Sequence, residues 1–244
     1  MKQRIKRLLN RLGYDLRGTR MTPRQLLRPE LLRQVSFDDL ICRRMYEADR
    51  PLTFVQIGAF DGEVQDPLRK YIAAEGWRGV MVEPQPRAAE RLRALYGEGG
   101  DVRVLQAAVD AQAGSRVLYT VESADAPAWA GGVASFRKEV LLKHEALVPG
   151  LSGMIREVPV ACVTFERVLG LLPGRELDLL QIDTEGADSA ILALFPFDRT
   201  RPAIVHWETA HLTLREREGC LCLLAGHGYR FAYSGTQDMV AVQF

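Results

Sequence analysis

Short apolar runs alternate with segments whose apolar residues recur every three to four positions, and this alternation covers most of the chain. The apolar runs are nearly continuous, as buried strands are. Strands that are apolar on both faces belong to parallel sheets covered by helices, so the pattern predicts an α/β fold. The predicted strands are residues 52–57, 79–82, 102–107, 177–182 and 203–207, and the predicted helices are residues 66–75, 86–96, 164–172, 188–195 and 214–226.

The alternation is interrupted in the middle of the chain and changes again at its end. Polar and apolar positions alternate in residues 116–121, which predicts an edge or hairpin strand. Residues 122–160 are rich in Gly, Ala and Pro, so we expect an irregular insertion before the fourth core strand. Residues 229–233 and 239–242 are typical of a closing β-hairpin.

The first 50 residues predict helices and no strand. Isoleucine and leucine form one apolar stripe within residues 3–13, and Ser36 lies three residues before an acid, as in an acidic variant of the capping box. We therefore expect a helical N-terminal extension over residues 1–50. The remaining residues, 51–244, form one larger domain with the insertion at about residues 115–160.

Composition and charge place the chain among globular proteins and divide it into two unlike parts. Hydrophobic residues make up 47% and charged residues 26%, which excludes a predominantly disordered chain. No run of about 18 apolar residues occurs, so we expect no membrane span. The net charge of +1 conceals a basic arm: residues 1–33 hold ten basic and two acidic residues, and the other 22 basic and 29 acidic residues give −7.

The basic arm has two interpretations. Its apolar stripe with basic flanks fits an interfacial helix, so residues 1–20 are candidates for peripheral contact with the inner face of a membrane. The alternative is packing on the body or on a second subunit, which would make a homodimer. No apolar segment follows the basic start, so we expect no secretory signal and a cytoplasmic protein.

The four cysteines show neither a Cys-x-x-Cys pair nor a metal-ligand spacing. Cys220 and Cys222 are two positions apart on a predicted helix and therefore do not share a face. We expect four reduced thiols, as is usual in a reducing cytoplasm.

Candidate chemistry follows the predicted strands, because ligands of open α/β sheets bind at the carboxyl ends of the strands. Gly58 and Gly62 follow the first strand and allow a tight turn close to a ligand, but they match neither Gly-x-Gly-x-x-Gly nor a P-loop. Glu83 follows the second strand. It is either an exposed strand-end acid or a carboxylate that accepts both hydroxyls of a ribose, and we favour the ribose. A ribose site without a pyrophosphate fingerprint indicates S-adenosylmethionine.

Acidic and histidine side chains follow the fourth and fifth strands. Asp183 and Glu185 either cap the next helix, hold a substrate or act as a base. His206, Glu208 and His211 come after or at the end of the fifth strand, where each histidine is either structural or part of an acid–base set.

Taken together and in order, these motifs resemble the FkbM-type S-adenosylmethionine-dependent methyltransferases, over roughly residues 37–242. An ordered set of this length is far more specific than any one motif. The stretches that carry the resemblance are VQIGAFDG (55–62), DP (66–67), GWRGVMVEPQP (76–86), LQAAVD (105–110), GGVASF (131–136), VPVACVTFERVL (158–169), LLQIDTEGAD (179–188), IVHWETAHL (204–212) and GYRF (228–231).

The resemblance implies a Rossmann-like class I methyltransferase fold, with a seven-stranded, mostly parallel sheet whose last strand is antiparallel. It also implies S-adenosylmethionine as the cofactor, with S-adenosylhomocysteine as the product. Many relatives have an acid in place of Gln56 and Asn in place of Phe60, so the chain departs from the family at two positions. The residues expected at the cofactor are Gln56, Gly58, Ala59, Phe60, Asp61 and Gly62 in the glycine loop, Glu83 and Pro84 at the ribose, Gln106, Ala107 and Ala108 near the adenine, and Asp183.

The family mostly methylates hydroxyl groups, often on sugars of glycans or natural products, so we expect a small-molecule or glycan acceptor. A hydroxyl is a poor nucleophile at neutral pH and needs a base. His206 is the first candidate, Asp183 and Glu208 are competitors, and Glu185 orients the acceptor or the base. Residues expected at the acceptor are Trp129, Ser135, Phe136 and His144 in the insertion, which would act as a lid, and His211.

Four other interpretations compete with this one. A divalent metal held by Asp183, Glu208 and His206 is an alternative to a protein base, although we predict no metal site because the spacing is not diagnostic. A catalytically weak scaffold of the same fold, or a nicotinamide-dependent oxidoreductase, is an alternative to the methyltransferase. Methylation of nucleic acid is disfavoured, because a basic arm on an acidic body is a poor duplex-binding surface.

Overall fold

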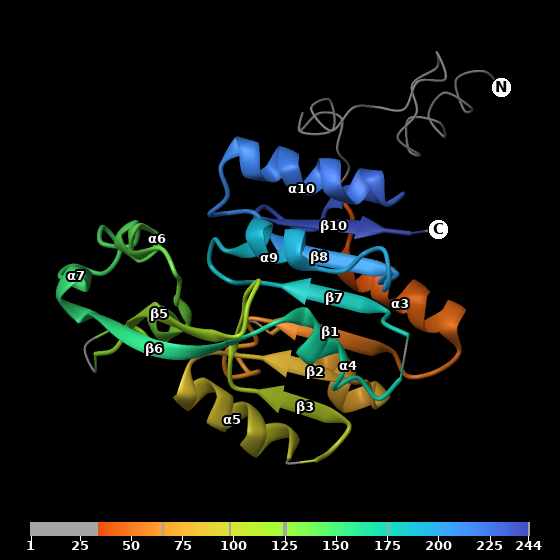
Figure 1. The fold of residues 1–244 in the computed structure, drawn as a ribbon, viewed down its shortest axis with the longest axis horizontal. Helices are drawn as coiled ribbons and strands as arrows, with labels where there is room; N and C mark the ends of the chain where they lie inside the picture. The colour runs from red at the N-terminus through yellow and green to blue at the C-terminus, as the bar shows by residue number, and fades with distance from the viewer. Residues whose placement is uncertain (1–33, 65, 98, 124–125, 175, 244) are drawn as a thin grey trace.

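The computed structural model describes residues 34–243 except 65, 98, 124–125 and 175 (Figure 1). The predicted helix within 3–13 and the whole basic arm lie outside the described residues. The extension is therefore described from residue 34, where helix α3 (Phe37–Ala48) begins after Ser36. The Ser36 hydroxyl accepts a hydrogen bond from the Asp39 backbone N–H at 3.1 Å, so the predicted N-cap is confirmed.

Seven strands form the central sheet in the order β3-β2-β1-β7-β8-β10-β9. Strand β10, the last in the chain, pairs antiparallel with β8 and with β9, and the other neighbours pair in parallel. This topology confirms the predicted α/β fold with a mostly parallel sheet and an antiparallel last strand. The strands are β1 (Thr53–Ile57), β2 (Arg78–Val82), β3 (Val102–Leu105), β7 (Leu179–Ile182), β8 (Ile204–Glu208), β9 (Arg230–Tyr233) and β10 (Asp238–Val242).

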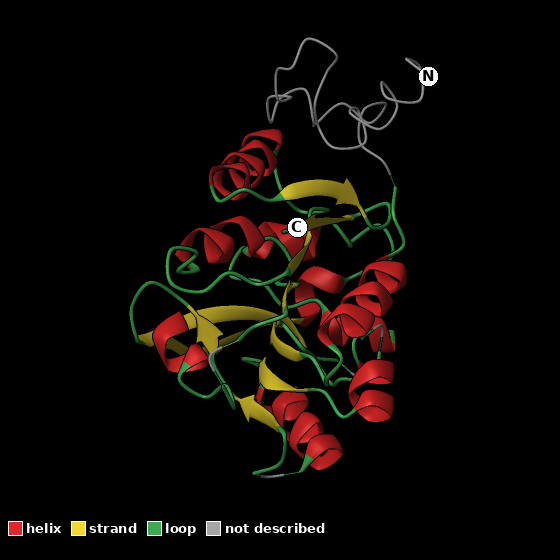
Figure 2. Ribbon diagram, turned by 90° about the vertical axis from the view of Figure 1, so that its right-hand side faces the viewer, coloured by secondary structure: helices red, strands yellow, loops and turns green. Residues whose placement is uncertain are grey.

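Helices cover both faces of this sheet (Figure 2). Side chains on both faces of a strand are therefore buried, which explains why the strands are nearly continuous apolar runs. In β1, Val55 and Ile57 join the core under one set of helices, while Phe54 joins the core under the other set. The large side chains of Trp77 and Trp207 are almost fully buried, each with about 1.5–3 kcal/mol or more of hydrophobic stabilisation. One face carries α8 (Phe165–Leu169), α9 (Asp188–Leu194) and α10 (Leu214–Gly226), and the other carries α3, α4 (Arg69–Glu75) and α5 (Pro86–Tyr96).

The insertion is more regular than expected. The prediction of an irregular segment over 122–160 is wrong at its end, because Ile155–Val163 forms strand β6. Strand β6 lies between β4 and β5 in a separate three-stranded sheet. Only Cys162 and Val163 of β6 pair with β4, so Pro159 has no strand partner on that side. A missing N–H is tolerated at such an unpaired edge. The other insertion elements are β4 (Ala108–Val109), β5 (Gly114–Val121), a 3₁₀ turn η1 (Ala128–Gly132), α6 (Lys138–Leu142) and α7 (Leu151–Met154).

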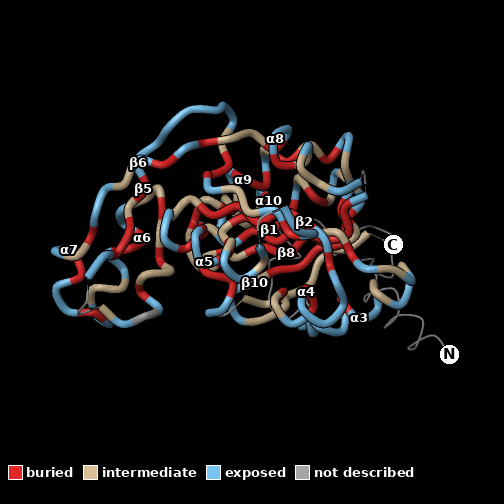
Figure 3. Tube along the Cα trace, turned by 90° about the horizontal axis from the view of Figure 1, so that it is seen from below, coloured by how far each residue is buried: buried red, intermediate tan, exposed pale blue. Residues whose placement is uncertain are grey.

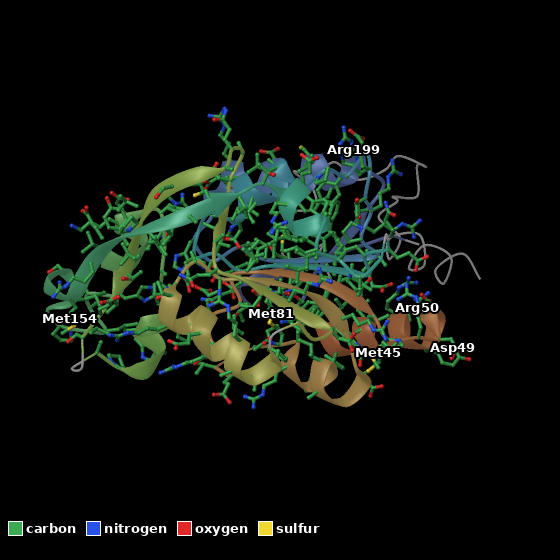
Figure 4. All side chains as sticks on the ribbon, turned by 60° about the horizontal axis from the view of Figure 1, so that its bottom comes forward. Met45, Asp49, Arg50, Met81, Met154 and Arg199 are labelled. Atoms are coloured by element: carbon green, nitrogen blue, oxygen red, sulfur yellow. The ribbon has the colours of Figure 1, made fainter. Side chains whose placement is uncertain are left out.

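The insertion projects beyond the carboxyl ends of the parallel strands, on the left of Figure 1. Figure 3 shows that buried residues are concentrated in the central sheet. A small separate core, with Val140, Leu141 and Leu151 among its members, holds the insertion together. In Figure 4, Met154 marks the tip of the insertion, and Asp49 and Arg50 lie at the opposite end of the molecule. The insertion therefore stands beside the edge of the sheet where ligands bind.

Two further predictions can be compared with the structure. All four cysteines are free, with Cys220 buried and Cys222 exposed on α10. Among the described residues, no helix has both the length and the apolarity to cross a membrane.

A buried carboxylate fastens α3 to the sheet at the end opposite the insertion. Asp178 is 1% exposed and accepts hydrogen bonds from the guanidinium groups of Arg44 and Arg50, at 2.6 and 2.8 Å, and from the Thr53 backbone N–H at 2.8 Å. Burial opposes ionisation, but the hydrogen bonds from Arg50, Thr53 and Arg44 hold the pKa of Asp178 below its ordinary value.

We predict that Asp178→Asn lowers the free energy of unfolding by about 3 kcal/mol at pH 7, because it leaves two cations beside a neutral group. Since the folded-state pKa is lowered, the loss should shrink as the pH falls through that pKa. Glu47→Gln, which removes an exposed pair with Arg43, is the control and should cost less than about 0.5 kcal/mol. Urea unfolding at pH 7 and pH 3.5 measures the free energy of unfolding of both variants. Equal losses of this free energy in the two variants would disprove the anchoring role of Asp178.

Candidate functional site

A cavity of about 530 Å³ opens at the carboxyl ends of β1, β2, β7 and β8, below the insertion. Its volume lies within the range of about 300–1,000 Å³ that is usual for pockets of drug-sized ligands. Both the loops after these strands and the insertion contribute to its lining. The position agrees with the rule for ligands of open α/β sheets.

The glycine loop forms one wall of this cavity. Gly58 has φ +79°, and a Cβ there would lie 1.7 Å from the backbone oxygen of Asp183. Only glycine therefore lets the loops after β1 and β7 approach so closely. Phe60 also has a positive φ of 46°, which costs a non-glycine residue energy and is typical of functional loops.

Glu83 connects the glycine loop to the end of β2. Its carboxylate accepts hydrogen bonds from the backbone N–H groups of Phe60 and Gln85, both at 2.8 Å, and it lines the cavity. The side chain is 3% exposed, and burial raises its pKa to about 7 although the two N–H groups oppose the shift. Each oxygen has a further lone pair to offer to a ligand.

Two acceptor atoms beside the glycine loop have no partner in the structure. The Gln56 side chain donates to the Asp66 carboxylate at 3.3 Å, which leaves Gln56 Oε1 and Asp66 Oδ2 buried and unsatisfied. Both residues line the cavity. Because buried acceptors normally have a donor, this pair suits a ligand with an ammonium group.

Most, but not all, of the residues expected at the cofactor lie at the cavity. Ala59, Phe60, Pro84, Ala107, Ala108 and Asp183 line it together with Gln56, Gly58 and Glu83.

Asp61, Gly62 and Gln106 lie off the cavity lining, contrary to expectation, and each has a physical reason. The Asp61 carboxylate accepts from two backbone N–H groups of its own loop, those of residues 63 and 64, at 3.0 Å. Gly62 faces helix α5, where a Cβ would lie 2.7 Å from the Leu92 side chain. Gln106 is exposed and faces Arg93 at 3.4 Å.

Carboxylates dominate the opposite wall. Asp183 lines the cavity and is exposed there. Desolvation by the surrounding protein, and then the charges of Asp188, Glu185 and further acids, raise its pKa well above the ordinary value. Desolvation and the same neighbouring charges raise the pKa of Glu208 to about 10. Asp188, not Asp183 or Glu185, accepts from the loop N–H groups of Thr184 and Gly186, at 3.2 and 3.0 Å.

His206 is placed differently from the expected role of a base. Its Nδ1 lies 2.6 Å from Gln181 Oε1 and its Nε2 lies 2.6 Å from Ser234 Oγ, so both ring nitrogens are engaged. Phe37 stacks on the ring at 4.1 Å, and burial lowers the pKa of His206 to about 3. The ring is therefore neutral and has no free lone pair for an acceptor hydroxyl, which argues against His206 as the base.

Two other histidines line the cavity with a free nitrogen. His211 Nε2 lies 2.9 Å from Glu185 Oε2, while His211 Nδ1 is buried and has no hydrogen-bond partner among residues 34–243 as described. His144 meets His211 edge-on at 5.9 Å and Trp129 at 5.6 Å, and its Nε2 also lacks a partner. Desolvation lowers the pKa of His144, which favours its neutral form.

The remaining insertion residues divide between the cavity and its support. Phe136 lines the cavity, and the guanidinium carbon of Arg116 lies 4.0 Å above its ring. Ser135 does not line the cavity. Its hydroxyl instead donates to the Glu185 backbone oxygen at 2.7 Å and accepts from the Arg137 N–H at 3.1 Å.

One group of described residues has the ligand types of a metal site. An atom each from Glu185, Glu208 and His211 lies within 4.8 Å of the others. The expected alternative, with His206, does not form, because His206 is occupied by Gln181 and Ser234. Since Glu185 and His211 are already paired with each other, we do not identify the group as a metal centre.

Comparison with known families assigns the chain. Residues 56–231 match the family described as the methyltransferase FkbM domain, which is well over half of the chain. The chain belongs to the FkbM methyltransferase family. The resemblance proposed from the motifs is thereby confirmed.

Solved methyltransferase structures show more distant likeness to this FkbM family member. A precorrin-6y C5,15-methyltransferase from Geobacter metallireducens is 12% identical, with 86% of this chain and 89% of that chain covered and a TM-score of 0.40. An O-methyltransferase from Bacillus cereus, in complex with SAH, is 12% identical, with 98% and 97% covered and a TM-score of 0.40. Because the TM-scores are low, the family assignment depends on the sequence match alone. No curated protein matches the chain.

Sequence reasoning missed several residues of this FkbM site. In the sequence, Asp66 stood out only as part of the DP stretch (66–67). Its position beside the Gln56 side chain depends on the turn before α4. Thr184, Gln85 and Asp238 line the cavity without any signal of their own. Ser234 could not be linked to His206 from the sequence, because the two come together only when β10 brings the chain back to β8.

We predict that Gly58→Ala lowers the free energy of unfolding by about 2 kcal/mol or more. The added Cβ must displace the Asp183 carbonyl, and a positive φ costs alanine energy as well. Gly219→Ala, in α10 with nothing within 4 Å of the new Cβ, is the control and should gain up to about 1 kcal/mol. Urea unfolding of both variants measures the difference. A neutral Gly58→Ala would show that the two loops are not in close contact.

Proposed function

We propose that this FkbM methyltransferase uses S-adenosylmethionine to methylate a hydroxyl group, on a sugar of a glycan or of a glycosylated natural product. One observation carries the cofactor assignment: the buried Glu83 carboxylate at the end of β2, which is held by two backbone N–H groups and lines the cavity. It has the position and the free lone pairs needed to accept the two hydroxyls of a ribose.

The other groups around the cavity fit the remaining parts of the cofactor. Gln56 Oε1 and Asp66 Oδ2, which lack donors, would hold its ammonium group. The adenine would lie against the apolar surface of Ala107, Ala108 and Leu118. Phe60, which replaces the Asn of many relatives, would cover the ligand from the glycine loop. When bound, the cofactor supplies an electrophilic methyl group, and the protein contributes alignment and a site with little water.

A hydroxyl acceptor is supported by the chemistry of the opposite wall. An imidazole there can take up the proton that a hydroxyl loses during methyl transfer. Trp129, 38% exposed, and Phe136 offer aromatic faces of the kind that pack against sugar rings. The acceptor would therefore enter beneath the insertion, between these rings and the acidic wall.

Two rivals from other classes remain testable. A nicotinamide cofactor is disfavoured because the loop after β1 lacks the Gly-x-Gly-x-x-Gly pattern. A non-catalytic scaffold would keep the cofactor site but would not need the histidines and acids of the opposite wall.

We predict that S-adenosylhomocysteine binds in calorimetry and that NAD does not. With methyl-labelled S-adenosylmethionine, label should pass to the oxygen of one or more members of a panel of methyl glycosides, located by mass spectrometry. Binding of NAD alone would overturn the cofactor assignment. Binding of S-adenosylhomocysteine without label transfer to any hydroxyl compound would favour the scaffold.

We also predict that cofactor affinity depends on the charge of Glu83. Because burial raises its pKa to about 7, the carboxylate is largely protonated at pH 6 and largely ionised at pH 8. If the ribose needs the ionised form, the Kd for S-adenosylhomocysteine should rise about tenfold from pH 8 to pH 6. Glu83→Gln does not titrate, so its binding should be weaker and nearly independent of pH. An equal pH dependence in both proteins would exclude Glu83 as its source.

A further inference from the structure

The pair formed by His211 and Glu185 has the arrangement of a general base and the group that orients it. His211 Nε2 lies 2.9 Å from Glu185 Oε2, and its side chain is 11% exposed. His211 Nδ1 is buried and has no hydrogen-bond partner in the part of the chain that the structure describes, and the residue lines the cavity. We infer that His211 is the catalytic base of the proposed methyl transfer and that Glu185 holds it in the active tautomer.

The tautomer follows from the partner. An ionised carboxylate can only accept a hydrogen bond, so the proton of a neutral His211 ring resides on Nε2, toward Glu185. The lone pair is then on Nδ1, which is the unpartnered nitrogen. A histidine that is oriented by a carboxylate through one nitrogen and acts through the other follows the general logic of activated catalytic pairs.

The other candidates lack this arrangement. Both nitrogens of His206 are occupied. Glu208 has a pKa of about 10, so at neutral pH it holds a proton and cannot accept another. His144 Nε2 is free, but among the described residues no carboxylate is hydrogen-bonded to its ring to stabilise a positive charge.

The backbone around the pair is fixed by the insertion. Glu185 has φ +52°, a strained conformation for a side chain of its size, and the Ser135 hydroxyl donates to its carbonyl at 2.7 Å. The Arg137 guanidinium donates to the carbonyl oxygens of Gly186 and of His211 and so links the two loops. Arg137 and Ser135 are therefore positioning residues, which act through Glu185 and His211.

The reaction step balances with this base. The acceptor oxygen forms a bond to the methyl carbon while the methyl–sulfur bond breaks and its electron pair stays on sulfur, which leaves S-adenosylhomocysteine. The proton of the acceptor hydroxyl passes to His211 Nδ1. The resulting imidazolium is stabilised by the Glu185 carboxylate at Nε2.

This inference depends on the proposed function, and the experiment separates the two. Label transfer to the methyl glycoside panel and calorimetry with S-adenosylhomocysteine are measured for the wild type, His211→Asn, Glu185→Gln and the control His227→Asn. His227 lies at the end of α10, away from the cavity lining, with Nδ1 3.8 Å from Asp198. We expect His211→Asn to lower kcat at least 100-fold and Glu185→Gln about tenfold, with the Kd for S-adenosylhomocysteine unchanged, and His227→Asn to change neither.

Turnover above one tenth of the wild-type kcat in His211→Asn would overturn the assignment. Loss of wild-type activity with a chelator and its recovery with Mg²⁺ would overturn it as well, because that result would indicate a metal held by Glu185, Glu208 and His211. Histidine ¹⁵N NMR of the wild type decides the orientation without any acceptor. Protonation of neutral His211 at Nε2 is expected, and protonation at Nδ1 would disprove the inference. If no glycoside is methylated, the proposed acceptor class fails, while the NMR result still decides the base.

Discussion

The close approach of two loops at the edge of the sheet is the constraint on which the rest of the site depends. Strands β1 and β7 are parallel neighbours, so the loops after Ile57 and Ile182 leave the sheet side by side. The Gly58 backbone almost touches the Asp183 carbonyl, a distance that no side chain at Gly58 would allow. This contact keeps the glycine loop and the acidic loop together as the two walls of one cavity.

The two walls differ in chemistry, and the difference separates binding from reaction. The glycine loop and the end of β2 present hydrogen-bond acceptors with unused capacity, at Glu83, Gln56 and Asp66. The acidic wall contains Asp183 and Glu208, whose pKa values are raised by desolvation and by the charges of neighbouring acids, together with a histidine that is paired with Glu185. In our account the first wall binds the cofactor and the second receives the proton of the acceptor.

The insertion supports the second wall. Its three-stranded sheet and small core give Ser135 and Arg137 a fixed position, from which they hold the backbone of Glu185, Gly186 and His211. The strained φ of Glu185 is thus stabilised from outside its own loop. A lid over the acceptor remains a prediction for the same segment.

Much of the fold could be predicted from local sequence. Helices α5 and α10 begin and end at the predicted residues, because Pro86 suits a first helical position and Thr213 forms a capping box with Glu216. Strand β6 was missed because proline and glycine near its start resemble a loop. Only the pairing with β5 on one side and the short pairing with β4 on the other show that Pro159 lies in a strand with an unpaired edge. Local signals fail where pairing between distant segments decides the structure.

The same limit applies to the site. The positions of Glu83, Asp183 and Glu208 at the cavity could be predicted, because each follows or ends a strand of the parallel sheet. The roles of the histidines could not be predicted, because they depend on distant partners. Ser234, 28 residues away, occupies His206, while Glu185, from the preceding strand–loop unit, is paired with His211.

In our proposal one cavity holds the cofactor along the glycine-loop wall and leaves the His211 wall free for an acceptor. A crystal structure with S-adenosylhomocysteine tests this most directly. We expect the ribose hydroxyls on Glu83, the amino group at Gln56 and Asp66, and the sulfur directed toward His211. A ligand bound outside this cavity, or with its ribose away from Glu83, would disprove the proposed cofactor site.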